Sequence, residues 1–411
     1  MDALTIANGF CTYFTNVVEK VLSSIPPLNW NQLSTEACLN NSSQSLFSLK
    51  PVSAAFVHRQ LRLLKTSKGT GLDGIPARLL KDAAPSILAP LTVIINPSIS
   101  SAVLPEEWKY ARVVPLYKDG DKKCMDNYRP ISVLPVASKI LERAVQIQLL
   151  QHLDTSSQLS PFQCGFRKNH STQDAVAYVT DCIRKGIDEG CVTAAVFVDF
   201  RKAFDSVNHQ LLLKKLPGYG INNHELRWFK NYLTIRCPSV VYGSAQSAPR
   251  QIKSGVPQGS IHGPILFSIC INDLPNCLLP SKILLYADDA VLFYADSNIG
   301  NISTVLNKDL KQLHSWTHLN KLCIHPVKTE YVLFGTKQRI ASPTLSDGPF
   351  SLFLGNKPIN QAQHYKYLGV LIDANLNFKQ HVDKLLVKIS KRIGVLGRIR
   401  NNQEPIGSKG F

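Results

Sequence analysis

Two adjacent carboxylates, Asp288 and Asp289, lie between two short apolar segments, residues 283–286 and 290–293. The aliphatic and aromatic content of both segments is typical of β-strands, whereas aspartate favours turns. The pattern therefore predicts a β-hairpin with the two aspartates at its tip. Like charges at a tip repel each other unless a cation lies there, and oxygen ligands on a rigid hairpin suit Mg²⁺. A solvated turn would have the same sequence, so other motifs must decide between the two interpretations.

A second acidic position, Asp199, follows the apolar segment 194–198, which has the composition of a buried strand. A helix-capping role fits Asp205 or Asn208 better than it fits Asp199. If both strands belong to one sheet, neighbouring strand ends bring Asp199 and Asp288 to a shared pair of metal ions. Two such ions activate an attacking 3′-hydroxyl and stabilise a leaving pyrophosphate, which is the chemistry of nucleotidyl transfer.

A basic hairpin would serve that chemistry. Lys118 and Arg129 flank a polar turn between the strands expected at 108–117 and 127–132. The hairpin either folds over a triphosphate or forms a solvated surface, and its sequence alone fits both interpretations.

Glycine-rich loops let backbone approach a ligand closely. The loop 254–260 contains Gly255 and Gly259 beside Gln258, a composition that suits contact with a nascent base pair. Residues 69–74 match G-x-G-x-x-G, but they follow a basic helical segment instead of a strand. We therefore reject a dinucleotide-binding site there and expect a basic turn that contacts phosphates.

The elements that must position these residues follow from apolar periodicity. Residues 1–52 form a weakly specified lead-in with a polar linker at 23–48, and Pro97 interrupts a helical segment. Single helices are expected at 53–64, 138–153, 172–188, 264–274, 307–319 and 382–399, and more than one helix within 211–233. Further strands are expected near 240–241, near 250–252, within 326–335 and at 364–373.

Composition limits the class of protein. The chain has 411 residues, a hydrophobic content of 44% and a net charge of +17, so a globular protein with a polyanionic partner is expected. The ten cysteines form no Cys-x-x-Cys pair, which argues against a zinc site. Neither a signal peptide nor a membrane-length apolar segment is visible, so we expect an intracellular protein of the nucleus or cytoplasm that does not enter membranes. The oligomeric state is left open.

The motifs occur in a characteristic order along the chain: Arg129 in Asn-Tyr-Arg-Pro-Ile-Ser, Asp199 in Phe-Val-Asp-Phe-Arg-Lys-Ala-Phe-Asp, then Gly-Val-Pro-Gln-Gly-Ser and Tyr-Ala-Asp-Asp. This order resembles the reverse transcriptases of non-LTR (LINE-type) retrotransposons. Lys328-Thr329-Glu330 and Tyr367-Leu368-Gly369-Val370 resemble the two later motifs of that family. The resemblance extends from about Lys65 to Val370.

The resemblance implies an α/β (α+β) right-hand polymerase with fingers, a palm built on an antiparallel sheet, and a short helical thumb. It assigns residues 53–188 to the fingers, 192–373 to the palm core and 374–411 to a partial thumb. The reverse transcriptase domain as a whole would span 98–372, after the lead-in of residues 1–52. No endonuclease segment is expected before these motifs.

The implied function is an RNA-directed DNA polymerase that extends a DNA 3′-hydroxyl on an RNA template. Its partners would be an RNA template, a DNA primer or target and dNTPs, and its cofactors two Mg²⁺ ions, with Mn²⁺ as the alternative. By resemblance, the catalytic residues are Asp199, Asp288, Asp289 and Lys328, and the metal ligands are Asp199, Phe200 through its carbonyl, Asp288 and Asp289. Substrate would contact Lys118, Arg129, Phe204, Gln258 and Gly259, and nucleic acid would contact Gly255, Lys384, Lys388 and Arg392.

Several alternatives remain at this point. Phe204 is either the aromatic gate that excludes a ribose 2′-hydroxyl or a core residue, and Lys328 is either a proton donor or a surface lysine. His262 stands where the family usually has an aliphatic residue. An RNA-dependent RNA polymerase is disfavoured because such enzymes normally have Gly-Asp-Asp, whereas Tyr286-Ala287 precede the aspartates here. An inactive, basic nucleic-acid-binding remnant is the non-enzymatic alternative.

Overall fold

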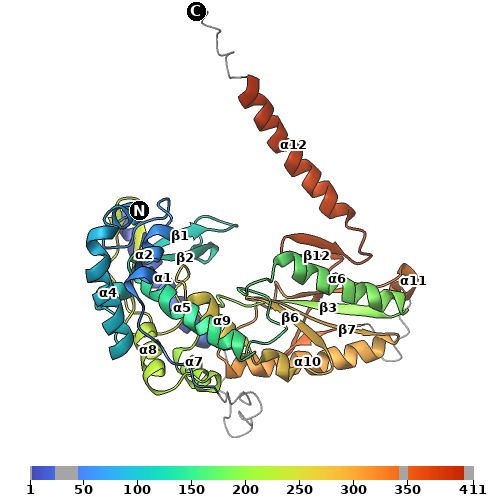
Figure 1. Cartoon of the computed structure of the whole chain (residues 1–411). Coiled ribbons are helices and arrows are strands. Elements are labelled where there is room, and N and C mark those ends of the chain that lie inside the picture. The colour runs from blue at the N-terminus through green and yellow to red at the C-terminus, as the bar shows by residue number, and fades with distance from the viewer. Residues whose placement is uncertain (1, 24–44, 342–349, 402–411) are drawn as a thin grey trace, which may run out of the picture.

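Two β-sheets and two short hairpins form the framework of the chain (Figure 1). The computed structural model describes residues 2–23, 45–341 and 350–401. The β-strands within these ranges are β1 (Tyr110–Tyr117), β2 (Tyr128–Val133), β3 (Val192–Asp199), β4 (Cys237–Tyr242), β5 (Ala245–Gln246), β6 (Lys282–Tyr286), β7 (Asp289–Asp296), β8 (Glu330–Phe334), β9 (Phe353–Leu354), β10 (Lys357–Pro358), β11 (Asn360–Gln361), β12 (His364–Tyr367) and β13 (Val370–Asp373).

Helices surround these strands, so the predicted mixed α/β class is confirmed. The α-helices of the described ranges are α1 (Ala3–Ser23), α2 (Ala54–Leu63), α3 (Ala77–Asp82), α4 (Ala84–Ser101), α5 (Ser138–Thr155), α6 (Thr172–Asp188), α7 (His209–Lys215), α8 (Asn223–Leu233), α9 (Gly263–Ile271), α10 (Ile299–Leu319), α11 (Lys337–Ala341) and α12 (Lys379–Asn401). In the ranges that the structure describes, no helix is both long and apolar enough to cross a membrane.

The larger sheet has the strand order β11-β8-β3-β7-β6, with β3 at its centre. Strand β3 pairs antiparallel with both β7 and β8, while β11 pairs parallel with β8. Helices α6 and α10 lie on opposite faces of this sheet (Figure 1). Both faces are therefore covered, which explains why β3 is apolar along its length instead of alternating with polar residues.

Alternate residues of β3 enter two different parts of the core. Val196 and Val198 pack with residues of α9 and α10, whereas Ala195 and Phe197 pack with residues of α6 and with Tyr367 of β12. This two-sided packing holds the end of β3 rigidly, because displacement of the strand would disturb both layers.

The smaller sheet has the order β2-β1-β4-β5, with β1 antiparallel to β2 and parallel to β4. The predicted basic hairpin thus exists as β1 and β2. Helix α1 packs against β4 and β5, so the segment expected to be a weakly specified lead-in begins with a docked helix. The predicted linker at 23–48 lies mostly outside the described residues.

Capping residues determine where two of the helices begin. Helix α6 begins after Ser171, whose side chain forms a capping box with Asp174, and the expected range 172–188 is confirmed. Helix α10 begins at Ile299 and not at the expected residue 307, because Asn298 caps it by accepting a hydrogen bond from the Gly300 amide. The apolar face of α10 therefore includes Ile302, which lies before the expected start of the helix.

Two expectations about secondary structure are wrong. The strand expected near residues 250–252 is reduced to one bridge between Arg236 and Ile252, because β4 pairs instead with β5 and Pro249 has no amide hydrogen to donate. Pro97 does not interrupt its helix, since α4 continues to Ser101. Pro97 lies on the exposed face, where water can satisfy the freed carbonyl, and the buried Ile95 holds the opposite face.

A compact joint connects the β12–β13 hairpin to α12. The buried carboxylate of Asp373 accepts hydrogen bonds from the backbone amides of Asn375, Asn377 and Phe378, at 3.1, 3.2 and 2.7 Å. Helix α12 then projects away from the rest of the chain (Figure 1). The expected helix at 382–399 is confirmed.

His262 is a polar residue in an aromatic core. Its side chain is fully buried among the rings of Trp228, Phe229 and Tyr232, and neither ring nitrogen has a hydrogen-bond partner. Burial, helped by the positive charge of Arg236, lowers the pKa of His262 from 6.5 to about 3. The imidazole is therefore neutral in the folded chain and unsatisfied, a combination that costs stability.

We predict that His262→Leu stabilises the protein by about 1–3 kcal/mol, the cost of an unpaired buried polar group. Below the ordinary histidine pKa the unfolded chain binds a proton that the folded chain does not, so the wild type loses stability as the pH falls. The increase in unfolding free energy caused by His262→Leu should thus be larger at about pH 5 than at about pH 7.5, as measured by thermal or urea unfolding. His58→Leu at the half-exposed His58 is the control, and a destabilised His262→Leu variant would contradict the prediction.

Candidate active site

The ends of β3 and β7 bring acidic residues together. Asp199 is the register partner of Asp289 across the antiparallel pair, and Tyr286 pairs with Asp289 to close the β6–β7 hairpin. The hairpin predicted from the apolar segments is thus confirmed, with Ala287 and Asp288 as its turn. Residues directly opposite each other in such a pair have Cα atoms roughly 4.5–5.5 Å apart. Three carboxylates consequently gather at one edge of the larger sheet.

A loop before α6 supports this turn, and sequence reasoning did not find that role. The Gln163 side-chain oxygen accepts hydrogen bonds from the amides of Ala287 and Gly165, at 3.1 and 2.8 Å. A Cβ atom on Gly165 would lie 2.1 Å from the Ala287 nitrogen, so only glycine allows the loop this close. Ala287 itself has a φ of 57°, in the left-handed region that alanine seldom adopts. The loop therefore holds a strained turn in place.

Burial and neighbouring negative charge raise the pKa of two of the carboxylates, Asp288 and Asp289. Burial and then the charge of Asp199 raise the pKa of Asp288, against the opposing charges of Arg129 and Lys118. Burial and the charges of Asp288 and Asp199 raise the pKa of Asp289 to about 6, although the residue remains open to solvent on one side. The site thus carries negative charge that its own cations only partly offset.

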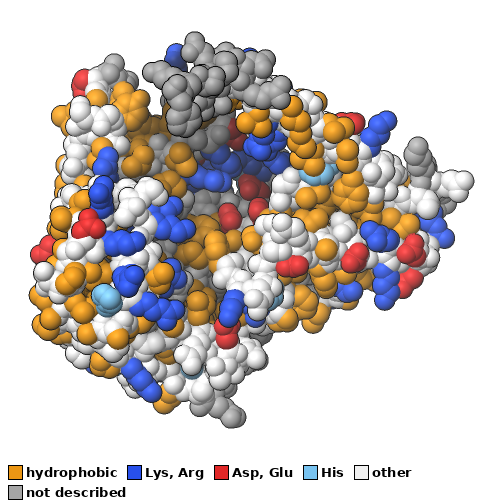
Figure 2. Space-filling model, turned by 45° about the horizontal axis from the view of Figure 1, so that its top comes forward, with side chains coloured by type: hydrophobic (Ala, Val, Ile, Leu, Met, Phe, Trp, Pro, Cys, Tyr) orange, Lys and Arg blue, Asp and Glu red, His pale blue; other side chains and the backbone are white. Residues whose placement is uncertain are grey.

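Those cations come from the β1–β2 hairpin. Arg129 pairs with Leu116 in the ladder, and the Lys118 amide donates to the Asn127 carbonyl at 2.9 Å. Both side chains are exposed, and both lower the pKa of Asp288 and Asp289, so they face the acidic cluster. Figure 2 shows a hollow in this face of the molecule with acidic and basic side chains gathered inside it.

The glycine-rich loop lies against the same hairpin. The Ser132 amide of β2 donates to the Gln258 carbonyl at 2.7 Å, and a Cβ on Gly259 would lie 2.4 Å from the Ser132 oxygen. The Gln258 side-chain amide donates to Asp205 at 2.8 Å. Gly255 has a φ of 86° and fits tightly against the Asp205 backbone. The expected loop residues thus meet β2 and the segment after β3.

Phe204 lies in the segment after β3 and packs against α9. Its ring stacks on Phe267 with 4.6 Å between ring centroids and meets Phe166 edge-on at 6.1 Å. The side chain is half-buried, so it combines contact with the core and a face left accessible.

The loop before β8 reaches the acidic edge through an unexpected residue, His325. Its amide donates to the Asp199 carbonyl at 2.7 Å, and the Arg201 amide donates to the Cys323 carbonyl at 2.7 Å. These bonds form a bridge between the buried Phe200 and the partly buried Ile324. Lys328 is exposed in the same loop. Nothing in the local sequence around His325 indicated this contact, because its partner lies far away along the chain.

Another residue missed from the sequence is Tyr365 of β12. It stacks on Phe197 with 4.1 Å between centroids, and burial together with the charges of Asp199 and Asp289 raises its pKa to about 12. By contrast, Lys384, Lys388 and Arg392 are exposed on the projecting helix α12, and the structure does not bring them to the acidic edge (Figure 1).

The donor set fits a hard divalent cation. Carboxylate oxygens are the ligands such ions prefer, and a bound cation would offset the burial and mutual repulsion that raise the pKa of Asp288 and Asp289. Across the described ranges, no three His, Cys, Asp or Glu side chains are arranged to hold an ion together. Mg²⁺ is usually held by one or two carboxylates and substrate phosphates instead of a cage of protein ligands.

Comparison with known proteins defines the class. Residues 118–372, more than half of the chain, match the family described as "Reverse transcriptase (RNA-dependent DNA polymerase)". This match implies a polymerase fold, and such enzymes use divalent metal ions.

The chain belongs to the reverse transcriptase family. It is 30% identical to the "Probable RNA-directed DNA polymerase from transposon BS" of Drosophila melanogaster over 89% of this chain and 40% of that protein. It is 29% identical to the "RNA-directed DNA polymerase from mobile element jockey" of the same species over 85% of this chain and 38% of that protein. The chain thus spans about 40% of the length of these curated relatives.

We predict that Asp289→Asn stabilises the metal-free protein at neutral pH and not in acid. Because the folded pKa of Asp289 is raised, the folded state favours the protonated form, and stability falls as the pH rises toward and through about 6. The variant should melt on the order of 1–2 °C higher at about pH 7.5 and equally at about pH 4.

Added Mg²⁺ should raise the melting temperature of the wild type more than that of the Asp289→Asn variant, because the ion relieves the same repulsion. Asp181→Asn on the exposed face of α6 serves as the control. Equal melting of wild type and Asp289→Asn at neutral pH would refute the electrostatic account of this edge.

Proposed function

We propose that this chain is the polymerase of a non-LTR retrotransposon and extends a DNA 3′-hydroxyl on an RNA template. The observation that carries the proposal is the meeting of Asp199, Asp288 and Asp289 at one sheet edge, with Lys118 and Arg129 facing them. An acidic cluster opposite a basic hairpin suits a substrate that is itself a triphosphate. The family match and the names of the relatives support the same reaction.

In this proposal the fingers are residues 53–188, which include β1 and β2 of the smaller sheet, and β4 and β5 complete that sheet from the palm range of the chain. The larger sheet belongs to the palm, at 192–373, and α12 begins a thumb at 374–411. The hollow between the β1–β2 hairpin and the acidic edge then receives the nucleotide, while RNA template and DNA primer lie across it. Lys384, Lys388 and Arg392 of α12 contact the backbone of the duplex.

The side chains around the hollow have distinct roles. Lys118 and Arg129 bind the triphosphate, and Asp199 and Asp288, with the Phe200 carbonyl and Asp289 as further oxygen donors, hold two Mg²⁺ ions. When bound, these ions supply activation of the attacking 3′-hydroxyl and stabilisation of charge on pyrophosphate. Lys328 gives a proton to the leaving pyrophosphate.

The proposal is tested by primer extension with purified protein on an RNA template annealed to a DNA primer. We expect dNTP incorporation, and we expect Asp199→Asn to reduce it by at least about 10²–10³-fold, the scale for removal of one group that stabilises a transition state. Asp181→Asn should leave the rate unchanged. A folded wild type that binds the duplex but extends nothing would identify the inactive remnant instead, and extension with rNTPs alone would identify an RNA polymerase.

Phe204 is proposed to select the sugar. Its half-buried ring is fixed from one side by Phe267, which leaves the other face to pack under a deoxyribose. A ribose 2′-hydroxyl would collide with such a fixed ring. Ribonucleotides are therefore excluded both because the Phe204 ring is large and because it cannot move aside.

We predict that Phe204→Val raises the ratio of ribonucleotide to deoxyribonucleotide incorporation by roughly tenfold or more, within the range that pocket shape can discriminate. Phe267→Leu is the matched control, since it loosens the same stack from the core side and should lower the melting temperature without admitting ribonucleotides to that extent. An unchanged sugar ratio in a well-folded Phe204→Val variant would mean that Phe204 is a core residue only.

A further inference from the structure

Helix α1 contacts segments that frame the candidate active site. The ring of Phe10 meets that of Tyr128 in β2 edge-on, with 4.9 Å between centroids. At the other end of the helix, the Cys323 thiol donates to the Val21 carbonyl at 3.7 Å, which joins α1 to the loop before β8. One helix therefore links the basic hairpin to the loop that contacts Asp199.

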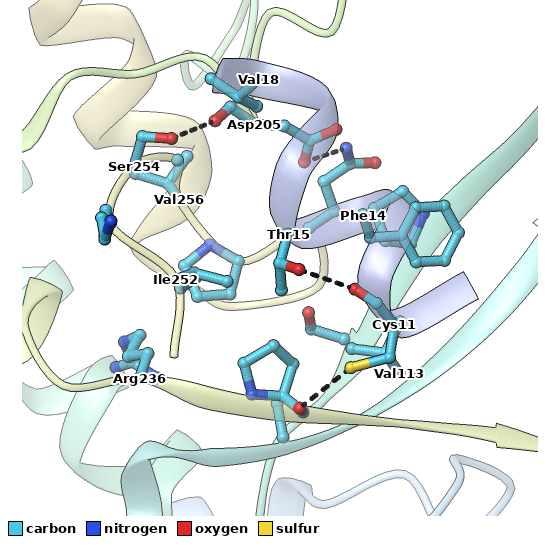
Figure 3. A pocket seen from close by; sticks show the side chains of 18 of the residues that line it. Cys11, Phe14, Thr15, Val18, Val113, Asp205, Arg236, Ile252, Ser254 and Val256 are labelled. Atoms are coloured by element: carbon cyan, nitrogen blue, oxygen red, sulfur yellow. Dashed lines mark hydrogen bonds between the residues drawn. The ribbon is translucent and has the colours of Figure 1, made fainter. Parts of the chain in front are cut away.

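Between Phe10 and Val21, α1 also covers one side of a cavity of about 70 Å³ beside the glycine-rich loop. Figure 3 shows Phe14, Thr15 and Val18 of α1 around this cavity, opposite Ser254 and Val256. Helix α1 is thus seated against the glycine-rich loop as well.

A polar cluster of three side chains joins α1 to the β1–β2 turn and to the segment after β3. The Tyr13 hydroxyl donates to the Asp126 carboxylate, and the Lys202 ammonium lies 3.1 Å from the same carboxylate oxygen. Lys202 also donates to the Asp126 carbonyl at 3.1 Å and lies 5.7 Å from the centre of the Tyr13 ring. Burial tends to raise the pKa of Asp126, but the hydrogen bonds from Tyr13 and Lys202 outweigh it and lower that pKa.

Each member of the cluster comes from a different segment. Tyr13 is in α1, Asp126 is in the turn that joins β1 to β2, and Lys202 comes three residues after Asp199. Lys202 has a φ of 50° and a side chain that is only 15% exposed, so the chain adopts a strained turn there and places a cation under cover. The Asp126 side chain is 44% exposed, so what distinguishes this pair from an ordinary surface ion pair is the covered Lys202 and the backbone conformation that holds it.

The position of the cluster determines what it can control. Asp126 precedes Asn127, whose carbonyl accepts the Lys118 amide, so the cluster holds the turn from which Lys118 extends. The charges of Lys118 and Arg129 act on the carboxylates from this hairpin. Movement of the turn would therefore change the spacing between the basic and acidic halves of the site.

We propose that Tyr13, Asp126 and Lys202 form a brace through which α1 fixes the β1–β2 hairpin at a set distance from Asp199. These are positioning residues, because none of them needs to touch the nucleotide. The kinetic consequence rests on the proposed function, since a fixed hairpin would keep Lys118 and Arg129 ready for the triphosphate. The structural consequence, an ordered hairpin, holds whatever the chain catalyses.

The brace is tested by amide hydrogen exchange of the whole chain in the absence of nucleotide. Tyr13→Phe removes only the hydroxyl, and exchange across residues 116–129 should accelerate by roughly three- to tenfold, because local opening of the hairpin becomes easier. Asp126→Asn should produce the same change without any alteration of α1. The control is Tyr331→Phe in β8, whose hydroxyl bonds the Phe350 carbonyl and Gln361, and exchange of the hairpin should not respond to it.

Two further measurements identify the mechanism. Combining Tyr13→Phe with Asp126→Asn should add little to either single change, because both break one unit. In primer extension, Tyr13→Phe should raise KM for dNTPs by roughly three- to tenfold with little change in kcat or in duplex binding.

Unchanged hairpin exchange in both Tyr13→Phe and Asp126→Asn, with melting temperatures showing that both fold, would overturn the brace. The two variants can also show accelerated hairpin exchange while the wild type extends no primer. That result would support the brace and contradict only the proposed polymerase activity.

Discussion

The register of β3 against β7 places Asp199 opposite Asp289, and this forced proximity of like charges is the constraint on which the site depends. Carboxylates that repel each other stay together only if the backbone beneath them cannot move apart. The sheet meets this requirement because both of its faces are packed, one against α10 and the other against α6. The packing of both sheet faces therefore keeps the core rigid and also holds the carboxylates together at the sheet edge.

The surroundings of the acidic edge compensate for its charge without neutralising it. Lys118 and Arg129 oppose the carboxylates from a separate sheet, so the hollow between the two sheets is lined by both signs of charge. The support of the turn is uncharged, since the Gln163 side chain accepts a hydrogen bond from the Ala287 amide and Gly165 lies close against the Ala287 backbone. Charge and shape are thus supplied by different parts of the chain, which leaves the carboxylates available to cations that arrive with a substrate.

Local patterns in the sequence predicted the elements that carry the site, and did so for physical reasons. The apolar segments around Asp288 specify a hairpin, and the capping residues of α6 specify where that helix begins. Contacts between distant segments were not predictable in this way. The bond between Gln163 and Ala287 joins residues 124 positions apart, and the bond between Tyr13 and Asp126 joins residues 113 positions apart. Periodicity and composition say nothing about which distant segments meet, so these supports emerged only from the folded chain.

The joint at Asp373 has a mechanical consequence for α12. A helix of 23 residues is roughly 34 Å long, and α12 is joined to the rest of the chain through a turn that one carboxylate organises. It therefore acts as a lever whose pivot is Asp373. A rotation of about 10° at the pivot displaces the far end by roughly 6 Å, about one turn of helix. The hydrogen bonds at this pivot therefore set where the exposed basic side chains of α12, among them Lys384, Lys388 and Arg392, lie relative to the acidic edge.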